Sequence, residues 1–518
     1  MMHDHSNHKW WTLFAMCFAL FMIMLDNTIV NVALPSIQRA LNPSPANLEW
    51  TINAYVLSFA ALILLGGKLG DRFGRKRMFV VGLIIFTAAS AACAGATTDT
   101  QLIVARAVQG TGAALLNPLS LSILVAAFPR KQLPTAIGAW AGISGLGLAI
   151  GPLLGGFLVE HYSWSAVFWV NVPVGIIAVG VTLWAVIESR DPTSHSLDIV
   201  GTLLVTSSLF LLTFGLIKTT SHAWLSAYTL SFLIGGAVLM ALFVLWESRH
   251  HDPMIPLDFF RRRAFSVSSI IITLVGVGLF GIIYFLTLYF QNVKGYSPQE
   301  AGVRSLPLTM MILVVAPLGG RMVNRVGPRA LMTVGMLLAS VGLFGLSRLH
   351  VDSSYNMIWP FQIMMGTGMA LTMPSVSSTG MAAVDQAKAG IASGVINASR
   401  QVGGAIGVAL LGSVGATLAA NSWHSFVSSQ VPAPAQSAAL RLTPLVQGGR
   451  ARAIDQLPVP HATALADQAL LSFQHGVRGA FFVGACLLFA AAVVAFVGLR
   501  SVPAPQQAEA PATAAVEA

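Results

Sequence analysis

The chain has 518 residues, of which 55% are hydrophobic and only 9% are charged, and its mean hydropathy is +0.74. Soluble globular domains carry about 25% charged residues, so this chain has too little polarity to cover a water-facing surface and is predicted to be an integral membrane protein. That prediction excludes soluble enzymes, nucleic-acid-binding modules and secreted disulfide scaffolds. The net charge of +10 is distributed in a way that indicates membrane topology and not a nucleic-acid-binding patch.

Fourteen segments are long and apolar enough to be membrane-spanning helices, which need about 20 mostly apolar residues. The first contains Asp26 and has no small-residue cleavage site, so it is predicted to be a span and not a cleaved signal peptide. Backbone polar groups in lipid must be satisfied within the segment, which makes every span a helix and the fold all-α. The segments lie near residues 10–33, 50–69, 78–97, 102–126, 134–159, 164–187, 198–217, 226–246, 265–290, 303–322, 329–348, 357–378, 392–417 and 478–499.

Lysine and arginine set the predicted orientation. With the N-terminus inside, the cytoplasmic segments carry about twice as many of these residues as the outer segments. An even number of spans then places both termini in the cytoplasm, and the basic excess also attracts anionic lipid head groups.

A stretch that follows the second predicted span recurs after the tenth. Residues 66–76 read GGKLGDRFGRK and residues 319–329 read GGRMVNRVGPR, and Gly110-Thr111-Gly112 of the fourth span is echoed by Gly366-Thr367-Gly368 of the twelfth. Transporters commonly carry such repeats, so two six-helix bundles are predicted to flank an inserted pair of helices. The predicted domains are a cytoplasmic N-terminus (1–9), an N-terminal bundle (10–187), two inserted helices with a cytoplasmic linker (188–264), a C-terminal bundle (265–499) and a disordered cytoplasmic tail (500–518).

Two further segments have predicted roles outside the spans. Residues 418–477 are rich in Ala, Pro, Gln and Ser, and are expected to form a long, partly ordered extracytoplasmic loop; a contact between this loop and a periplasmic adaptor is left open. Met254–Arg263 is predicted to be a short amphipathic helix at the inner interface.

Asp26, Arg106 and Arg400 are charged residues that fall well inside predicted spans. A charge at the bilayer centre costs roughly 2.5–3.5 kcal/mol on insertion scales, so each is expected to face the protein interior or a water-filled cavity. A buried ion pair or bonds to backbone carbonyls would be purely structural, but a functional role is the better expectation for an ionisable group in a membrane. Arg400 has no acidic partner in any span of its bundle, so backbone carbonyls, water and an anionic group of a substrate all stay open as its contacts.

Asp26 and Arg106 are expected to lie at similar depth. At 1.5 Å per residue they lie about 12 Å and about 7–8 Å from the outer ends of their helices. They are predicted to pair directly or through water, and to form a site whose proton affinity changes when helices move.

Four motifs, in order and on the expected spans, resemble those of the fourteen-helix drug:proton antiporters of the major facilitator superfamily. They are the first-helix motif (25–35, LDNTIVNVALP), the cytoplasmic loop motif (67–77), the fourth-helix motif (106–114, RAVQGTGAA) and the fifth-helix signature associated with antiport (147–156, GLAIGPLLGG). The similarity continues through 164–173 and 291–298, and so covers nearly all of residues 10–417.

The resemblance implies that Asp26 handles protons or cationic substrates and that Arg106 takes part in proton transfer. In the loop motif it implies that Asp71 meets the end of another helix, and that Arg72 and Arg75 bridge to neighbouring acidic groups. Gly67 and Gly74 permit a tight turn. The candidate gating residues are Gly67, Asp71, Arg72, Gly74, Arg75, Gly147, Gly151, Pro152, Gly155 and Gly156.

The fifth-helix glycines are spaced by four, so they line one face and allow close helix approach, while Pro152 provides a kink. This pattern suits a rocking contact between the bundles, although plain tight packing would produce the same sequence.

The sequence therefore predicts a proton-coupled secondary exporter of hydrophobic or amphiphilic compounds, with multidrug efflux as the expected activity, working by alternating access in a bacterial inner membrane. No phosphate-binding loop of the Gly-x-x-x-x-Gly-Lys-Ser/Thr type occurs, so the proton motive force is expected to drive transport without a cofactor.

Some relatives that expel dicationic drugs carry an acidic residue in the tenth helix, and residues 303–322 have none, so divalent cations are less expected as substrates. The candidate substrate-binding residues are Asp26, Asn31, Asn53, Tyr55, Gln109, Tyr289, Gln291, Gln362, Asn397 and Arg400.

Other functions are less favoured. A dedicated exporter of an endogenous metabolite, lipid or siderophore would use the same scaffold, whereas Asp26, Arg106 and the antiport signature argue against a receptor or scaffold that has lost transport. An enzyme is least expected, because no nucleophile–base or metal-ligand constellation is found. The cysteines lie in apolar runs, and the N-terminal histidines His3, His5 and His8 are expected to be a solvated tail and not a metal site.

Overall fold

The computed structural model describes residues 5–43, 45–190, 198–218, 226–250, 253, 255–449, 451–455 and 462–500. These residues form helices joined by turns, and the described part of the chain contains no strand, which confirms the predicted all-α class. The helices of the first half are α1 (His5–Leu41), α2 (Pro45–Phe73), α3 (Arg75–Ala94), α4 (Asp99–Ala127), α5 (Leu133–His161), α6 (Ala166–Trp169) and α7 (Asn171–Ala185). They are followed by α8 (Ile199–Lys218), α9 (Ala227–Glu247) and α10 (Asp258–Arg261).

The second half begins at α11. Its helices are α11 (Arg263–Leu288), the π-helical turn η1 (Tyr289–Val293), α12 (Pro298–Arg304), α13 (Leu306–Val326), α14 (Pro328–Leu346), α15 (Tyr355–Ala382), the 3-10 turn η2 (Gln386–Lys388), α16 (Ala389–Gln430), α17 (Ala433–Leu440), α18 (Thr443–Gln447), α19 (Ala451–Asp455) and α20 (Ala462–Gly498).

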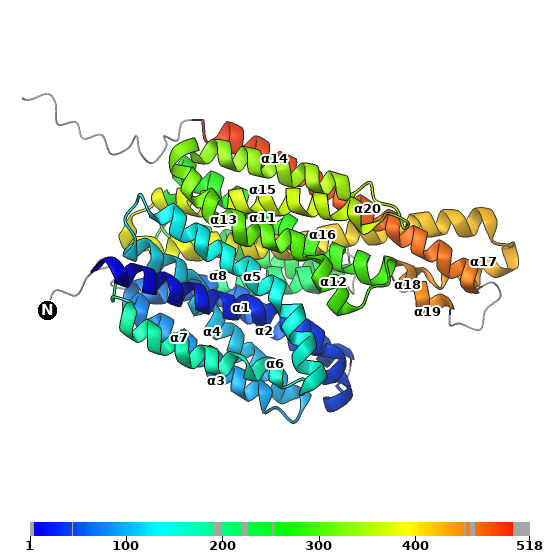
Figure 1. Cartoon of the computed structure of the whole chain (residues 1–518), viewed down its shortest axis with the longest axis horizontal. Coiled ribbons are helices and arrows are strands. Elements are labelled where there is room, and N and C mark those ends of the chain that lie inside the picture. Colours follow the sequence, from blue (N-terminus) through cyan, green and yellow to red (C-terminus); the bar gives the residue numbers. More distant parts are fainter. Residues whose placement is uncertain are drawn as a thin grey trace, which may run out of the picture.

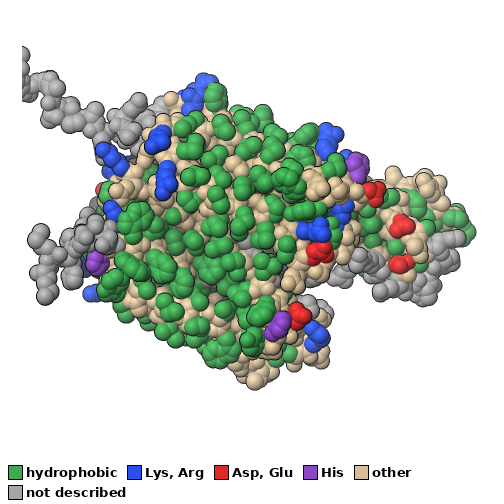
Figure 2. All heavy atoms as spheres, in the orientation of Figure 1, with side chains coloured by type: hydrophobic (Ala, Val, Ile, Leu, Met, Phe, Trp, Pro, Cys, Tyr) green, Lys and Arg blue, Asp and Glu red, His purple; other side chains and the backbone are tan. Residues whose placement is uncertain are grey.

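Twelve helices in the described part are long and apolar enough to cross a membrane, with α6 and α7 counted as one span. The other two predicted spans correspond to α5 and α15, which are 29 and 28 residues long; their count as spans stays a prediction. Figure 2 shows a broad belt of hydrophobic side chains with lysine and arginine toward both ends. A belt of this kind matches the hydrocarbon layer of a bilayer, so the chain is a multi-pass membrane protein.

The two halves lie side by side, with α1–α7 below and α11–α20 above in Figure 1. Glycines of the internal repeat make equivalent contacts in both. A Cβ atom on Gly112 of α4 would lie 2.7 Å from Phe86 N of α3, and one on Gly368 of α15 would lie 2.6 Å from Ala339 N of α14. Each glycine therefore allows a close helix crossing that no larger residue would permit, at the same place in each half.

The inserted pair lies at the edge of the first half. Helix α8 packs against α2 and also contacts α16, whereas α9 packs mainly against α8. The predicted amphipathic helix 254–263 is shorter in the structure, because α10 has four residues and Arg263 already begins α11. Residue 254 lies outside the described part, as do residues 1–4 and the predicted tail from 501 onward.

The predicted loop 418–477 contains more helix than expected. Helix α16 continues to Gln430 and α20 starts at Ala462, so both helices run well past the predicted ends of their spans at 417 and 478. Their extensions carry α17–α19 and enclose a small apolar cluster centred on Trp423, which is completely buried. The alanine-rich sequence favours helix, and this cluster stabilises the extensions outside the hydrophobic belt (Figure 1).

We call the end of the molecule that holds residues 67–77 the loop-motif face, and the opposite end, from which α16 and α20 project, the hairpin face.

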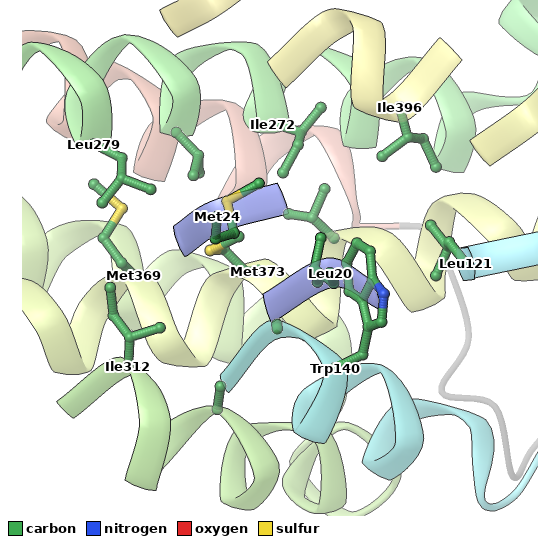
Figure 3. Packing of buried hydrophobic residues seen from close by; sticks show 14 of the residues in the cluster. Leu20, Met24, Leu121, Trp140, Ile272, Leu279, Ile312, Met369, Met373 and Ile396 are labelled. Carbon is green, nitrogen blue, oxygen red and sulfur yellow. The ribbon is translucent and has the colours of Figure 1, made fainter. Parts of the chain in front are cut away.

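Apolar side chains close the space between the two halves. Figure 3 shows Met24 of α1 close to Met373 of α15, with Leu20 of α1 and Trp140 of α5 next to them and Ile396 of α16 farther along the same packing. These residues belong to one buried hydrophobic cluster that includes helices of both halves. The interface at mid-depth is thus packed with adaptable methionine and branched side chains.

Candidate functional site

Asp26 of α1 is the centre of a polar network inside the first half. Its side chain is completely buried. Arg106 Nη1 donates to Asp26 Oδ2 at 2.6 Å, and Oδ1 accepts from Gln109 Nε2 at 2.9 Å and from Asn171 Nδ2 at 3.2 Å. Donors from α4 and α7 therefore satisfy a carboxylate on α1, which is what a buried charge requires.

Gln109 connects the members of this network. Its amide oxygen accepts from Arg106 Nη1 at 2.6 Å, and its amide nitrogen donates to Ser90 Oγ of α3 at 2.7 Å as well as to Asp26. Arg106 and Gln109 are one turn apart on α4, so both reach the same carboxylate.

Helix α2 completes the surroundings of Arg106. The Nε atom of Arg106 donates to the Thr51 carbonyl oxygen at 3.1 Å, and the guanidinium lies 4.3 Å from the centre of the Tyr55 ring. The Tyr55 hydroxyl and Asn171 Oδ1 are buried and have no hydrogen-bond partner among the described residues. The network thus holds one ion pair together with two buried polar atoms that have no partner among the described residues.

The fifth-helix glycines lie against α1 beside this network. A Cβ atom on Gly147 would lie 2.8 Å from Met24 Cβ, one on Gly151 would clash with Thr28, and one on Gly155 would lie 2.9 Å from Ile29 Cγ1. The suggested contact between bundles is therefore wrong for this stripe, and the tight-packing alternative holds, because α1 and α5 belong to the same half. A Cβ atom on Gly156 would meet nothing within 4 Å.

Two other glycines of α5 face the second half instead. A Cβ atom on Gly138 would lie 2.5 Å from the Ala316 carbonyl oxygen of α13, and one on Gly142 would lie 2.9 Å from that of Leu313. Pro152 is part of α5, but its side chain lies outside the described part.

Asp71 of α2 binds the start of α16 at the loop-motif face. Its Oδ1 accepts from Gly390 N at 2.9 Å and its Oδ2 from Ile391 N at 2.7 Å. Free backbone N–H groups and the positive end of the helix dipole make a helix N-terminus a favourable place for a carboxylate. Gly67, one turn earlier, allows this approach, because a Cβ atom there would lie 2.5 Å from the Gly390 carbonyl oxygen.

Arg75 holds Asp71 from the other side. Its Nε and Nη2 atoms lie 2.9 and 2.7 Å from Asp71 Oδ1, and Nη2 also donates to the carbonyl oxygen of Ala387 at 2.7 Å and to that of Gln386 at 3.1 Å. Arg75 thus contacts the Asp71 carboxylate in its own half and the backbone carbonyls of Gln386 and Ala387 in the second half, and so joins the two halves.

The other residues of the loop motif have different contacts. Gly74 has φ = 105°, a value suited to glycine, and the Glu188 carboxylate accepts from the backbone N–H groups of Lys76 and Arg77 at 3.0 and 3.1 Å. Arg72 lies 5.0 Å from the Phe73 ring centre and forms no ion pair with the residues that the structure describes. The implied bridge to an acidic group is therefore found for Arg75 and not for Arg72.

Comparison with known proteins identifies the family of this chain. The family model for the major facilitator superfamily matches residues 16–408. The chain belongs to that superfamily.

Three similar proteins are named as resistance or export proteins. The chain is 35% identical over 511 residues to the tetracenomycin C resistance and export protein of Streptomyces glaucescens, covering 98% of this chain and 95% of that protein. It is 36% identical over 426 residues to the multidrug resistance protein Stp of Mycobacterium tuberculosis (strain CDC 1551 / Oshkosh), covering 82% and 79%. It is 37% identical over 418 residues to the puromycin resistance protein pur8 of Streptomyces alboniger, covering 79% and 83%.

Solved structures show the same superfamily fold. The human organic anion transporter MFSD10 matches with a TM-score of 0.61 at 13% identity, covering 95% of this chain and 100% of that one. The proton:xylose symporter XylE matches with a TM-score of 0.62 at 12% identity, covering 94% and 95%.

The remaining predicted residues of this superfamily member fall outside the Asp26 network. Asn31 is exposed and donates to the backbone of its own helix at Asn27, and Asn53 is half-buried on α2. In η1, the Tyr289 hydroxyl donates to the His350 carbonyl oxygen at 3.0 Å, and Gln291 of the same turn is half-buried.

Two predicted sites in the second half are buried. Gln362 of α15 is completely buried, and neither atom of its amide has a partner among the described residues. Asn397 and Arg400 contact each other on α16, where Arg400 Nη2 donates to Asn397 Oδ1 at 3.2 Å.

Sequence reasoning missed Ser90, Asn171 and the Thr51 carbonyl. Asn171 stands in an otherwise apolar stretch between Val170 and Val172, and an isolated amide in a membrane helix is a signal that could have found it. Ser90 and Thr51 carry no such signal, because small hydroxyl residues are common in membrane helices. No group of three or more potential metal ligands occurs in the part of the chain that the structure describes.

Proposed function

We propose that the chain is a proton-coupled exporter of hydrophobic or amphiphilic compounds, with multidrug efflux as its activity. It works by alternating access in the bacterial inner membrane. In this proposal the loop-motif face and both termini are cytoplasmic, in line with the excess of basic residues in the predicted inner segments. The buried Asp26–Arg106 pair carries the proposal, because an ionisable pair inside a membrane bundle is a functional site by default.

Asp26 is the proton carrier in this proposal. Protonation of the carboxylate removes its charge, and the bond to Arg106 loses most of its electrostatic attraction. The new O–H group needs an acceptor, and Asn171 Oδ1 is a buried acceptor without a partner whose own amide nitrogen lies 3.2 Å from Asp26. A turn of the Asn171 amide would satisfy the protonated form, and the freed guanidinium keeps the Tyr55 ring and the Thr51 carbonyl.

The Asp71–Arg75 contact is the proposed gate on the cytoplasmic side. It binds α2 to the start of α16, so the loop-motif face opens only when these bonds break. Ser393 Oγ of α16 donates to the Pro118 carbonyl oxygen of α4 at 2.6 Å, and Asn324 Nδ2 of α13 donates to the Lys131 carbonyl oxygen at 2.7 Å. Closure at this face therefore rests on several polar contacts between the halves, which can exchange with water on opening.

The apolar interface between the halves supports a hydrophobic cargo. Met24, Met369 and Met373 line it together with aliphatic side chains, and methionine adapts its shape to different partners. The named relatives confer resistance to tetracenomycin C and puromycin or to multiple drugs, and transport of comparable organic compounds is proposed here.

Ethidium efflux tests the proposal. Inverted membrane vesicles containing wild-type protein or Asp26→Asn are energised, and dye uptake is followed with and without a protonophore. We expect uptake by wild type that collapses with protonophore and is absent in Asp26→Asn. Uptake that survives Asp26→Asn unchanged would remove Asp26 from the coupling mechanism.

A dedicated exporter is the second candidate. The tetracenomycin C relative matches this chain over nearly the whole of both proteins, and its printed name gives a single compound. Wild-type vesicles that move no cationic dye but take up tetracenomycin C in a protonophore-sensitive way would favour this candidate.

Two interactions outside the bundles belong to the proposal as well. Membrane lipids contact the hydrophobic belt, and the helical extensions of α16 and α20 at the hairpin face are where a periplasmic adaptor would bind. Protons and the transported compound are the other proposed partners, and no cofactor is proposed.

A further inference from the structure

Arg400 differs from the other deeply buried arginines because it has no acidic partner among the residues that the structure describes. Arg106 pairs with Asp26 and Arg75 pairs with Asp71. Arg400 is 4% exposed, and its hydrogen bond to Asn397 Oδ1 is the side-chain bond that the described structure gives it. A guanidinium has five N–H donors, so most of its bonding capacity is unused in the described part of the chain.

The side of α16 that carries Arg400 includes one contact with the first half. Ser393, Asn397 and Arg400 are spaced by four and three residues and share one side of the helix. Ser393 Oγ contacts the Pro118 carbonyl oxygen of α4, and Ile396, one turn before Arg400, lies in the apolar packing between the halves (Figure 3). Arg400 is therefore placed beside the interface that alternating access would open.

Asn117 provides an independent sign of a ligand at the same interface. It precedes Pro118 on α4 and is completely buried, yet neither its amide nitrogen nor its amide oxygen has a partner among the described residues. Asn117 also lies two turns from Gln109 along one side of α4. Buried amides are expected to be hydrogen-bonded, so Asn117 has the capacity to bind a polar group that the closed structure does not contain.

The chemistry of these side chains selects an anion. A guanidinium fork matches two acidic oxygens and binds them more strongly than neutral groups, Asn397 Oδ1 orients the fork, and the Asn117 amide can donate one more bond. Met373 and Ile396 belong to the buried apolar cluster that joins the two halves, and Ile396 lies one turn before Arg400 on α16, so apolar side chains of this cluster suit the hydrophobic body of the same compound.

We propose that Arg400, oriented by Asn397 and assisted by Asn117, forms an anion subsite that binds the acidic oxygen of a hydrophobic organic acid. The subsite rests on the proposed export function, whose proton site at Asp26 is separate. It makes lipophilic organic acids a cargo class, and it makes Arg400 a residue that decides specificity.

Two dyes with the same ring system test the subsite. Fluorescein is anionic and rhodamine 6G is a cation built on the same xanthene ring. Binding of each dye to purified full-length protein in detergent is measured by fluorescence anisotropy for wild type, Arg400→Gln, Arg400→Lys and Asn117→Ala. Arg329→Gln is the matched control, because Arg329 is a half-buried arginine of the same half that donates to the Phe496 carbonyl oxygen.

We expect Arg400→Gln to weaken fluorescein binding by about tenfold or more, the range for a charge-assisted hydrogen bond. Arg400→Lys and Asn117→Ala should weaken it less, and Arg329→Gln should not change it. Rhodamine 6G binding should change by less than about twofold in every variant. The expected result is thus a selective loss of the anionic dye.

Three results would overturn the subsite: no saturable fluorescein binding by wild type, equal fluorescein binding by wild type and Arg400→Gln, or equal losses of both dyes in Arg400→Gln. Ethidium efflux by wild-type vesicles separates this failure from failure of the export function. Wild-type efflux that is sensitive to protonophore, together with fluorescein binding that Arg400→Gln does not change, leaves export in place and removes the anion subsite.

Discussion

Arg106 Nη1 lies 2.6 Å from Asp26 Oδ2, and both side chains are at most 2% exposed. In a low-dielectric interior such a pair is held by mutual attraction and by the hydrogen bonds around it. Loss of either partner leaves the other as an uncompensated buried charge. The pair therefore links α1 to α4 through two buried charges that stabilise each other.

Removal of one partner should destabilise the protein more than removal of both. Asp26→Asn leaves Arg106 buried without a counter-ion, and Arg106→Gln leaves the carboxylate unpaired, at a cost of about 3–5 kcal/mol each. The double variant Asp26→Asn/Arg106→Gln replaces the pair with amides, leaves no unpaired charge, and should lose less than either single variant. Thermal unfolding of the four proteins in detergent checks this, and additive losses would contradict a coupled pair.

Asp26→Asn should abolish proton coupling without stopping movement of the dye across the membrane. In proteoliposomes, a 100 mV potential supplies about 2.3 kcal/mol per charge, which corresponds to roughly a 50-fold gradient per coupled charge at equilibrium. We expect Asp26→Asn to abolish accumulation of ethidium against its gradient while equilibrium exchange of the dye between the two sides continues. Exchange that stops completely would indicate that Asp26 is needed for substrate binding or for the conformational change itself.

The sequence predicted the residues of the Asp26 network that carry a charge or belong to a motif. Asp26 and Arg106 could be placed at similar depth from helix geometry, because each position is fixed by its distance from a helix end. Asn171 and Ser90 could not, since their contribution depends on how α3 and α7 pack around α4. The Gly147 stripe shows the same limit: its spacing predicts a close helix approach, but the identity of the partner helix is decided by packing.

The long loop shows a limit of a different kind. Hydropathy located the spans of α16 and α20 but set their ends at 417 and 478, where the sequence becomes polar. The helices continue because Trp423, Val427, Ala466 and other apolar residues bury one another outside the membrane, a tertiary effect that a hydropathy window does not contain.

The Trp423 cluster should be a separate unit of stability. Trp423 is completely buried and its Nε1 donates to the Ala439 carbonyl oxygen at 3.2 Å. Trp423→Ala should destabilise the helical extensions by about 3–5 kcal/mol and expose residues 431–449 to protease added from the hairpin side. Ethidium efflux should stay close to wild type, and an equal loss of efflux would show that the extensions act in transport.

The Asp71 contact should hold the loop-motif face closed. In Asp71→Asn the charge that binds the start of α16 is lost, together with the ion pair to Arg75. A cysteine introduced as Ser393→Cys in a background without the three native cysteines reports access from this face. We expect Asp71→Asn to increase its rate of reaction with a membrane-impermeant thiol reagent several-fold, and an unchanged rate would show that Asp71 does not control closure.

The same reporter tests whether glycine is required where α2 meets α16. A Cβ atom on Gly67 would lie 2.5 Å from the Gly390 carbonyl oxygen, which is backbone and cannot swing away. Gly67→Ala should therefore push α2 away from α16 and increase the labelling of Ser393→Cys.

Gly320→Ala should have a similar effect on the equivalent contact, because a Cβ atom there would clash with the Pro134 carbonyl of α5. Gly156→Ala is the matched control, since its Cβ would meet nothing within 4 Å, and labelling in this variant should equal that of the parent. Equal labelling of the Gly67→Ala variant and the control would contradict a role for the α2–α16 contact in closing the face.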